Sequence, residues 1–180
     1  MKRFIPFILF SLAILFLSLL LARDHNQQPH TRPMPELVLT SLDGKNHWVQ
    51  SDLNGKVTVI NFFASWCSPC AAEMPELMKF QKQYSDVVVY GVAWNDEPKT
   101  VSQWLKKNGN PFRTVWIDAQ GDATMALGLK GVPETIVIDA SGMVRYQLSG
   151  PLTKQIRNEL FDPLIHELQK EAAKGSDSAH

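Results

Sequence analysis

Apolar residues are spread unevenly along the chain of 180 residues. The longest apolar run, FIPFILFSLAILFLSLLLA at residues 4–22, contains no charged side chain. At about 1.5 Å of rise per helical residue it extends roughly 28 Å, close to the hydrocarbon thickness of a bilayer. The alternative is a cleaved signal peptide, but this run is longer than the apolar part of such peptides and ends in a poor cleavage site. We therefore predict that residues 1–22 form a membrane anchor, and Lys2 and Arg3 favour a cytoplasmic N-terminus.

The polar pattern after this run divides the rest of the chain into three parts. Residues 23–33 are polar, contain proline and show no periodicity, which predicts a linker that holds a domain away from the membrane. Residues 34–171 alternate short β-branched runs with amphipathic segments, which predicts one globular domain. Residues 172–180 are small and polar, and we predict a flexible tail.

Hydrophobic periodicity predicts the order of elements within the domain. The expected elements are a hairpin at 36–50, strands at 56–65, 87–93 and 112–118, helices at 70–85, 95–109 and 122–129, a second hairpin at 134–148, and a terminal helix at 153–172 with a break near Pro163. The strand at 56–65 is apolar on both faces in its second half and belongs in the middle of a sheet. Strands alternating with helices predict an α/β fold, a mixed sheet with helices on both faces.

Charge and composition narrow the functional classes. The chain has 18 Lys and Arg residues and 18 Asp and Glu residues, so its formal net charge is zero. A nucleic-acid-binding surface usually shows a basic excess, so nothing here supports a nucleic acid as partner.

The chain has two cysteines, Cys67 and Cys70, in the segment ASWCSPCAAE. Cys67 stands where a strand ends and a helix begins, so unpaired backbone N–H groups and the helix dipole stabilise its thiolate. Cys70 follows one turn later and can resolve a mixed disulfide by attacking the Cys67 sulfur, while Pro69 stiffens the loop between them. The pair is interpreted as a redox-active dithiol, so no other cofactor is expected.

Other interpretations of the two cysteines fit less well. A structural disulfide closing so small a loop stabilises a fold only weakly. A zinc site needs about four ligands, but the chain has no second cysteine pair and its five histidines are scattered, so no metal site is predicted. Haem attachment needs a histidine directly after the second cysteine, and Ala71 stands there.

A second motif, GVPET at residues 131–135, places Pro133 directly before a predicted strand. A proline here suits a cis peptide bond in a tight turn, although an ordinary proline at the start of a strand is the plainer interpretation.

Taken together, the WCxxC motif and the Val-Pro before the next-to-last strand resemble the thioredoxin-like superfamily. The segments NFFASWCSPCAAEMPEL, WLKKNGNPF and GVPETIVID further resemble the membrane-anchored thiol:disulfide interchange proteins of cytochrome c biogenesis, the DsbE/CcmG type. The resemblance covers roughly residues 34–170. It implies a thioredoxin-like fold with an N-terminal hairpin and a central helix–strand insertion at about 96–117.

The resemblance also implies roles for individual residues. Cys67 would be the nucleophile and Cys70 the resolving thiol of a Cys67–Cys70 disulfide. Pro133, preceded by Val132, would be the cis-proline beside that disulfide. Trp66 would shield the disulfide, although it could equally be a packing aromatic residue.

Two acidic residues and one dipeptide complete the comparison with the family pattern. Glu73 matches the family's acidic residue six positions after the first cysteine, and Glu134 matches the one after the cis-proline. Their alternative roles are a complement to the helix dipole for Glu73 and a solvated charge at a strand edge for Glu134. Ser68 followed by Pro69 departs from the order of residues in close relatives. The redox potential is therefore the family property that can least be carried over to this chain.

The family role implies a periplasmic domain on the inner membrane that reduces the cysteines of apocytochrome c, or of a maturation partner, before haem attachment. Electrons would come from a membrane thiol reductase of the DsbD or CcdA class. Two alternatives remain: a general disulfide oxidase, and a non-enzymatic chaperone that handles metal or haem through its thiols. Carboxylates near Cys67 disfavour a thiolate, and strong oxidants owe their power to a very stable thiolate, so Glu73 and Glu134 favour the reductant.

Overall fold

The computed structural model describes residues 27–28 and 31–177. The predicted membrane anchor at residues 1–22 lies outside them. Within the part that the structure describes, no helix is both long and apolar enough to cross a bilayer.

The described residues form one mixed sheet with the strand order β1-β8-β7-β4-β5-β6-β3, and β2 also pairs with β8. The strands are β1 (Gln27–Gln28), β2 (Arg32–Pro33), β3 (Thr40–Ser41), β4 (Thr58–Phe63), β5 (Val88–Trp94), β6 (Thr114–Asp118), β7 (Glu134–Ile138) and β8 (Met143–Ser149). Strands β4, β5 and β6 run parallel, while β7 and β8 add antiparallel strands on the other side of β4. Every residue of β4 is buried, as its apolar pattern predicted for a central strand.

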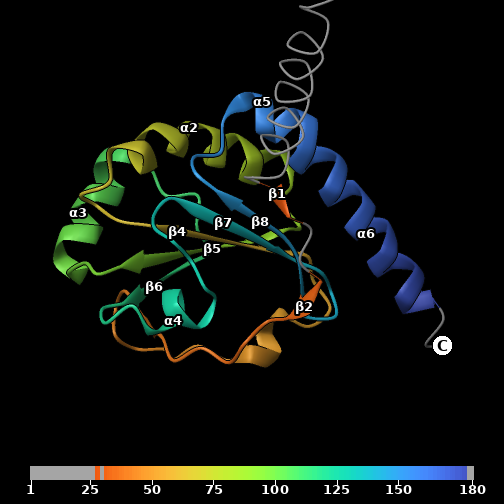
Figure 1. The fold of residues 1–180 in the computed structure, drawn as a ribbon, viewed down its shortest axis with the longest axis horizontal. Coiled ribbons are helices and arrows are strands. Elements are labelled where there is room, and N and C mark those ends of the chain that lie inside the picture. The colour runs from red at the N-terminus through yellow and green to blue at the C-terminus, as the bar shows by residue number, and fades with distance from the viewer. Residues whose placement is uncertain (1–26, 29–30, 178–180) are drawn as a thin grey trace, which may run out of the picture.

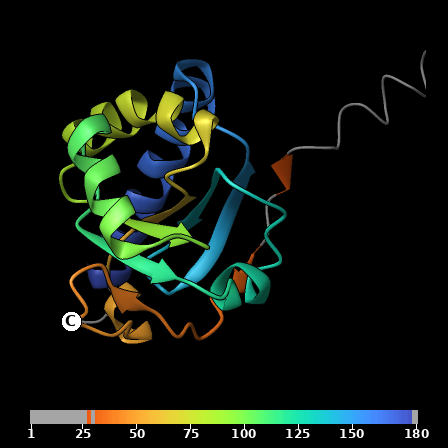
Figure 2. The same ribbon diagram turned by 90° about the vertical axis from the view of Figure 1, so that its left-hand side faces the viewer.

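Helices cover both faces of this sheet (Figures 1 and 2). They are the 3₁₀ turn η1 (Gln50–Leu53), α2 (Ser68–Gln83), α3 (Pro98–Asn108), α4 (Asp122–Ala126), α5 (Lys154–Ile156), the π-helical turn η2 (Arg157–Phe161) and α6 (Asp162–Asp177). The thioredoxin-like architecture predicted from the sequence is therefore confirmed in its sheet and its helical layers.

Alternation along β4 divides the core into two apolar clusters. Val59 and Phe63 face α2, α3 and α6, and they belong to the cluster that also contains Cys67 and Cys70. Ile60 belongs to the second cluster, which packs against η1 and α4 on the opposite face. Which face a β4 side chain occupies therefore decides whether it can act on the cysteines.

The structure differs from the sequence prediction at the N-terminal side of the domain. The predicted linker, residues 23–33, contributes β1 and β2, which pair antiparallel with β8. The predicted hairpin at 36–50 is reduced to β3 and a single bridge between Thr40 and His47. Each of these strands has two residues, which is too short to show a hydrophobic period in the sequence. They form because their backbones pair with β8 and β6.

The C-terminal helix also differs from its prediction. The break expected near Pro163 is the π-helical turn η2, directly before Asp162. Helix α6 then continues to Asp177, beyond residue 172, where the sequence predicted a flexible tail.

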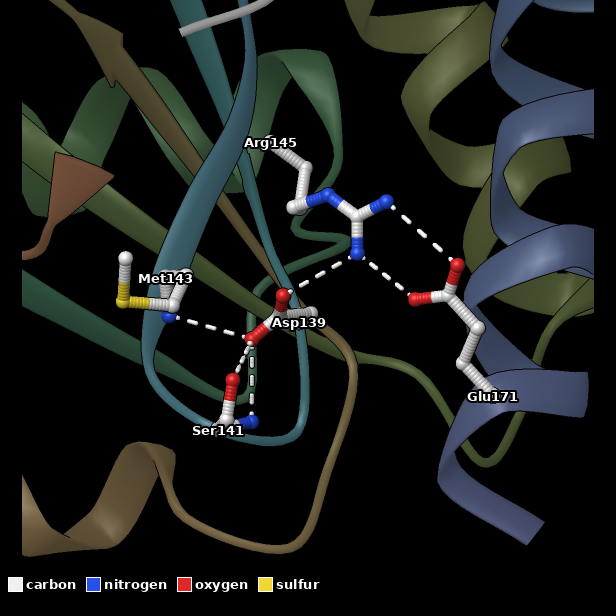
Figure 3. A network of polar contacts seen from close by, with 5 residues as sticks. All are labelled: Asp139, Ser141, Met143, Arg145 and Glu171. Carbon is white, nitrogen blue, oxygen red and sulfur yellow. Dashed lines mark hydrogen bonds and ion pairs between the residues drawn. The ribbon is translucent and has the colours of Figure 1, made fainter. Parts of the chain in front are cut away.

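A polar network ties α6 to the β7–β8 turn (Figure 3). Asp139 accepts hydrogen bonds from the backbone N–H and hydroxyl of Ser141 and from the Met143 N–H. Arg145 bridges Asp139, at 3.1 Å, and Glu171 of α6, at 2.6 Å. Burial pushes the pKa of Asp139 upwards, but these hydrogen bonds outweigh it and hold the pKa below its ordinary value.

Candidate active site

The two cysteines lie at the start of α2, directly after central strand β4. Cys67 is the N-cap of α2 with an extended backbone, and its Sγ accepts a hydrogen bond of 3.1 Å from the Cys70 N–H. The two residues form a disulfide with an S–S distance of 2.01 Å. Cys67 keeps 6% of its surface exposed and Cys70 keeps none, so an incoming sulfur reaches Cys67 first. Backbone N–H groups at this helix end favour a thiolate on Cys67.

The dipeptide between the cysteines lies in the first turn of α2. Ser68 and Pro69 are both exposed, and the proline removes no hydrogen bond there because the first N–H groups of a helix have no partner within it. The loop is therefore rigid and open to a partner chain.

Trp66 directly precedes Cys67 in the chain, and its side chain is 58% exposed. Its indole N–H donates to the Asn95 carbonyl at 3.3 Å, and its ring lies 5.9 Å from that of Trp94. The Asp96 carboxylate accepts the Ser65 N–H at 2.6 Å. The β5–α3 connection thus holds the cysteine loop in place.

Asp96 is a site residue that sequence reasoning missed. Asp96 is not the N-cap of the helix that follows, because the N-cap of α3 is Glu97, whose side chain makes no capping bond. A short polar residue after a buried strand, at the same sheet end as the cysteines, was the available signal.

The Val132–Pro133 peptide bond is cis, as the family resemblance implied for Pro133. In the antiparallel register of β4 and β7, Glu134 lies opposite Phe62, so the proline comes next to the end of β4 that leads to the cysteines. Val132 packs against both core clusters. The structure therefore brings the cis-proline and the disulfide to the same end of the sheet.

Glu73 lies in α2, three residues after Cys70, so both side chains occupy the same buried helix face. Its carboxylate accepts the Leu152 N–H at 2.7 Å and the Asn61 side-chain N–H at 2.9 Å. Burial raises the pKa of Glu73 to about 7, against the opposing effect of these two hydrogen bonds. The role of helix-dipole complement does not describe Glu73, because its carboxylate faces the sheet beyond the first turn of α2.

Glu134 is also buried, with 2% exposure, so it is not a solvated charge at a strand edge. It accepts the Lys130 N–H at 2.7 Å and the Gln147 side-chain N–H at 2.9 Å. Its neighbour Thr135 contacts Asn61 on the α2 face, so alternation places Glu134 on the opposite face of the sheet. The two carboxylates that the sequence placed together beside Cys67 are therefore on different faces, and Glu134 holds the cis-proline loop.

No group of three or more His, Cys, Asp or Glu side chains within residues 27–28 and 31–177 is arranged to hold a metal ion.

Comparison with known proteins assigns the family. The Redoxin family profile matches residues 29–160. The thiol:disulfide interchange protein DsbE of Escherichia coli K12 is 34% identical over 145 residues, which cover 79% of this chain and 77% of that protein. The chain belongs to the DsbE family of thiol:disulfide interchange proteins. DsbE of Pseudomonas aeruginosa is 32% identical over 178 residues, covering 95% of this chain and 98% of that protein.

A solved structure agrees with the DsbE assignment. A thiol:disulfide interchange protein of the thioredoxin family from Chlorobium tepidum superposes with a TM-score of 0.63 at 30% identity, covering 78% of this chain and 98% of that protein. This DsbE-family chain is accordingly a thiol:disulfide oxidoreductase, and Cys67 and Cys70 are its only cysteines. The fold presents one sulfur to a partner and keeps the other behind it, which suits sequential attack and release.

Proposed function

We propose that this DsbE-family protein is a membrane-anchored reductant that delivers two electrons to oxidised cysteine pairs of apocytochrome c, or of a maturation protein carrying them, before haem attachment. The observation that carries the proposal is Glu73, a buried carboxylate next to Cys70 whose pKa is raised by burial to about 7. Such a group can accept a proton near neutral pH. The resemblance of GVPETIVID and WLKKNGNPF to the proteins of cytochrome c biogenesis supports the choice of substrate.

The reaction proceeds in two exchanges. The Cys67 thiolate attacks one sulfur of the substrate disulfide, and the other substrate sulfur leaves as a thiolate. Cys70 then gives its proton to Glu73 and attacks Cys67 Sγ. This step forms the Cys67–Cys70 disulfide and expels the second substrate thiolate. The substrate gains two electrons and the dithiol loses them.

The direction of electron flow follows from local charge. A buried carboxylate beside the cysteines disfavours a thiolate, and a less stable thiolate makes the dithiol a better reductant. Glu73 supplies this effect on the α2 face. A dedicated oxidant would need the opposite environment, rich in groups that stabilise the thiolate.

The location and the electron supply belong to the same proposal. Residues 1–22 would anchor the chain in the inner membrane and leave the domain in the periplasm. The dithiol is then the only redox group required. A membrane thiol reductase of the DsbD or CcdA class would reduce the Cys67–Cys70 disulfide after each turnover.

The test is capture of partners on the nucleophile. Cys70→Ala should accumulate mixed disulfides on Cys67 with an apocytochrome c or a cytochrome maturation protein, and Cys67→Ala is the matched control that should not. We expect a reduction potential of roughly −170 to −260 mV by glutathione equilibrium, between thioredoxin at about −270 mV and the oxidant DsbA at about −120 mV. A potential above about −140 mV would instead identify a general oxidase. Binding of copper or haem in place of disulfide exchange would identify a thiol chaperone.

A further inference from the structure

Asn61 is a fully buried amide in the middle of β4, on the face that packs against α2. Its Nδ2 donates to Glu73 Oε1 at 2.9 Å and to Thr135 Oγ1 at 3.1 Å. Its Oδ1 is buried and has no hydrogen-bond partner among the described residues. A buried amide oxygen without a partner is costly, so its retention at this position calls for an explanation.

Glu73 sits among neutral groups. The neighbouring elements present the Asn61 amide from β4, the Thr135 hydroxyl from β7 and a backbone N–H at Leu152. Cys70 lies on the same face of α2, within the apolar core cluster that also contains Tyr146 of β8. Burial raises the pKa of Tyr146 to about 12, so its hydroxyl stays neutral. Among the described residues no cation acts on the pKa of Glu73, so its charge depends on these hydrogen bonds.

When Glu73 takes up a proton, the oxygen that carries it becomes a hydrogen-bond donor and needs an acceptor nearby. The Leu152 N–H is fixed in the backbone and occupies Oε2, so the proton goes to Oε1, which faces Asn61. An O–H at that position needs an acceptor, whereas Asn61 presents a donor there. If the amide turns over, Oδ1 faces both Glu73 and Thr135, and it accepts the new O–H and the threonine hydroxyl. The turn gives Oδ1 two donors in the protonated state and moves Nδ2 to the position that has no partner among the described residues.

We propose that Asn61 is a positioning residue for the proton step, donating to the charged form of Glu73 and turning its amide over when Glu73 takes the proton from Cys70. The inference rests on the proposed role of Glu73 and adds a second residue to it. Asn61 touches neither sulfur nor substrate, and acts by setting how readily Glu73 accepts the proton.

The test measures Glu73 directly in the oxidised full-length protein. Carbon-13 NMR of the side-chain carboxyl gives the titration midpoint of Glu73, and nitrogen-15 NMR follows the Asn61 side-chain NH₂ group across the same pH range. In the wild type we expect the Asn61 signals to shift with the midpoint of Glu73. Signals that stay constant while Glu73 titrates would overturn the proposal, and this measurement needs no variant to fold.

Asn61→Leu removes the donor while keeping an apolar side chain of similar size. The pKa of Glu73 should rise by roughly one to two units, the shift that corresponds to losing one hydrogen bond to a charged group. The pH at which Cys70 resolves a mixed disulfide should rise with it. Thr58→Val is the matched control, because Thr58 is equally buried in β4 but faces the other core cluster. It should leave the Glu73 midpoint unchanged.

The outcomes separate this inference from the proposed function. An unchanged Glu73 midpoint in Asn61→Leu refutes the role of Asn61 even if the protein reduces its substrate normally. A shifted midpoint in a protein that proves to be an oxidase supports Asn61 and rejects the proposed direction of electron flow.

Discussion

Glu73 should make the oxidised protein more stable as the pH falls from 8 to 5. Its pKa in the folded state is about 7, above the value of 4.5 for an unperturbed glutamate. A raised carboxyl pKa contributes stability that is complete below the unfolded value and is lost as the pH rises through the folded value. The stability therefore changes mainly between pH 4.5 and about pH 7, where the folded state binds more protons at Glu73 than the unfolded state does.

The size of the effect follows from the same two values. At 1.36 kcal/mol per pKa unit, the shift corresponds to on the order of 3 kcal/mol between full protonation and full ionisation. Most of this difference falls between pH 8 and pH 5, so about 2.5 kcal/mol should appear in the free energy of unfolding.

The assay is urea unfolding of the oxidised full-length protein, followed by tryptophan fluorescence at several pH values and constant ionic strength. Glu73→Gln is the comparison protein, because its amide keeps an acceptor for the Leu152 N–H and cannot ionise. Histidines and other groups titrate in both proteins, so the difference between the two curves isolates Glu73. If the two curves run parallel from pH 5 to pH 8, the burial argument for Glu73 is wrong.

Substitutions at four other residues test separate parts of the structure. Asp139→Asn should lower the free energy of unfolding by about 1–2 kcal/mol at pH 7 by weakening the β7–β8 turn, and urea unfolding near pH 3 should show a smaller loss. Gly91→Ala should cost about 1–3 kcal/mol in the same assay, because a Cβ there would lie 2.7 Å from the Phe112 ring. Trp66→Ala should leave the unfolding midpoint nearly unchanged, because the ring is exposed, while stopped-flow reduction of a protein disulfide becomes slower. Glu134→Leu should destabilise the fold by about 1–3 kcal/mol through unpaired donors, whereas Glu134→Gln, which keeps an acceptor, should unfold near the wild-type midpoint.

Local signals made the central part of the fold predictable. The apolar residues of β4 occur on both of its faces, which identifies a central strand without knowledge of its neighbours. The end of the apolar strand before Cys67, with Pro69 in the first turn after it, marks the helix start that carries the chemistry. These features depend on residues within a few positions of one another.

Contacts between distant segments account for what the sequence could not predict. The partners of Glu73 are Asn61, 12 residues earlier, and Leu152, 79 residues later, so no local pattern reveals that its carboxylate is buried. The polar residues before residue 34 have no strand pattern of their own, and they pair only because β8 offers an unpaired edge. The opposite faces of Glu73 and Glu134 follow from alternation only after the β4–β7 register is known.

The pairing of β1 and β2 with β8 also bears on how a shortened form of this protein should be prepared. A chain shortened to the sequence-derived domain boundary at residue 34 would lose both strands, together with the hydrogen bonds from Arg32 to the Leu127 carbonyl and the Gln147 side chain. Strand β8 would then present unpaired N–H and C=O groups along its outer side, a ready template for pairing with the same strand of another molecule. A shortened chain that begins before Gln27 keeps this edge covered, so it should stay monomeric at concentrations where the shorter one self-associates.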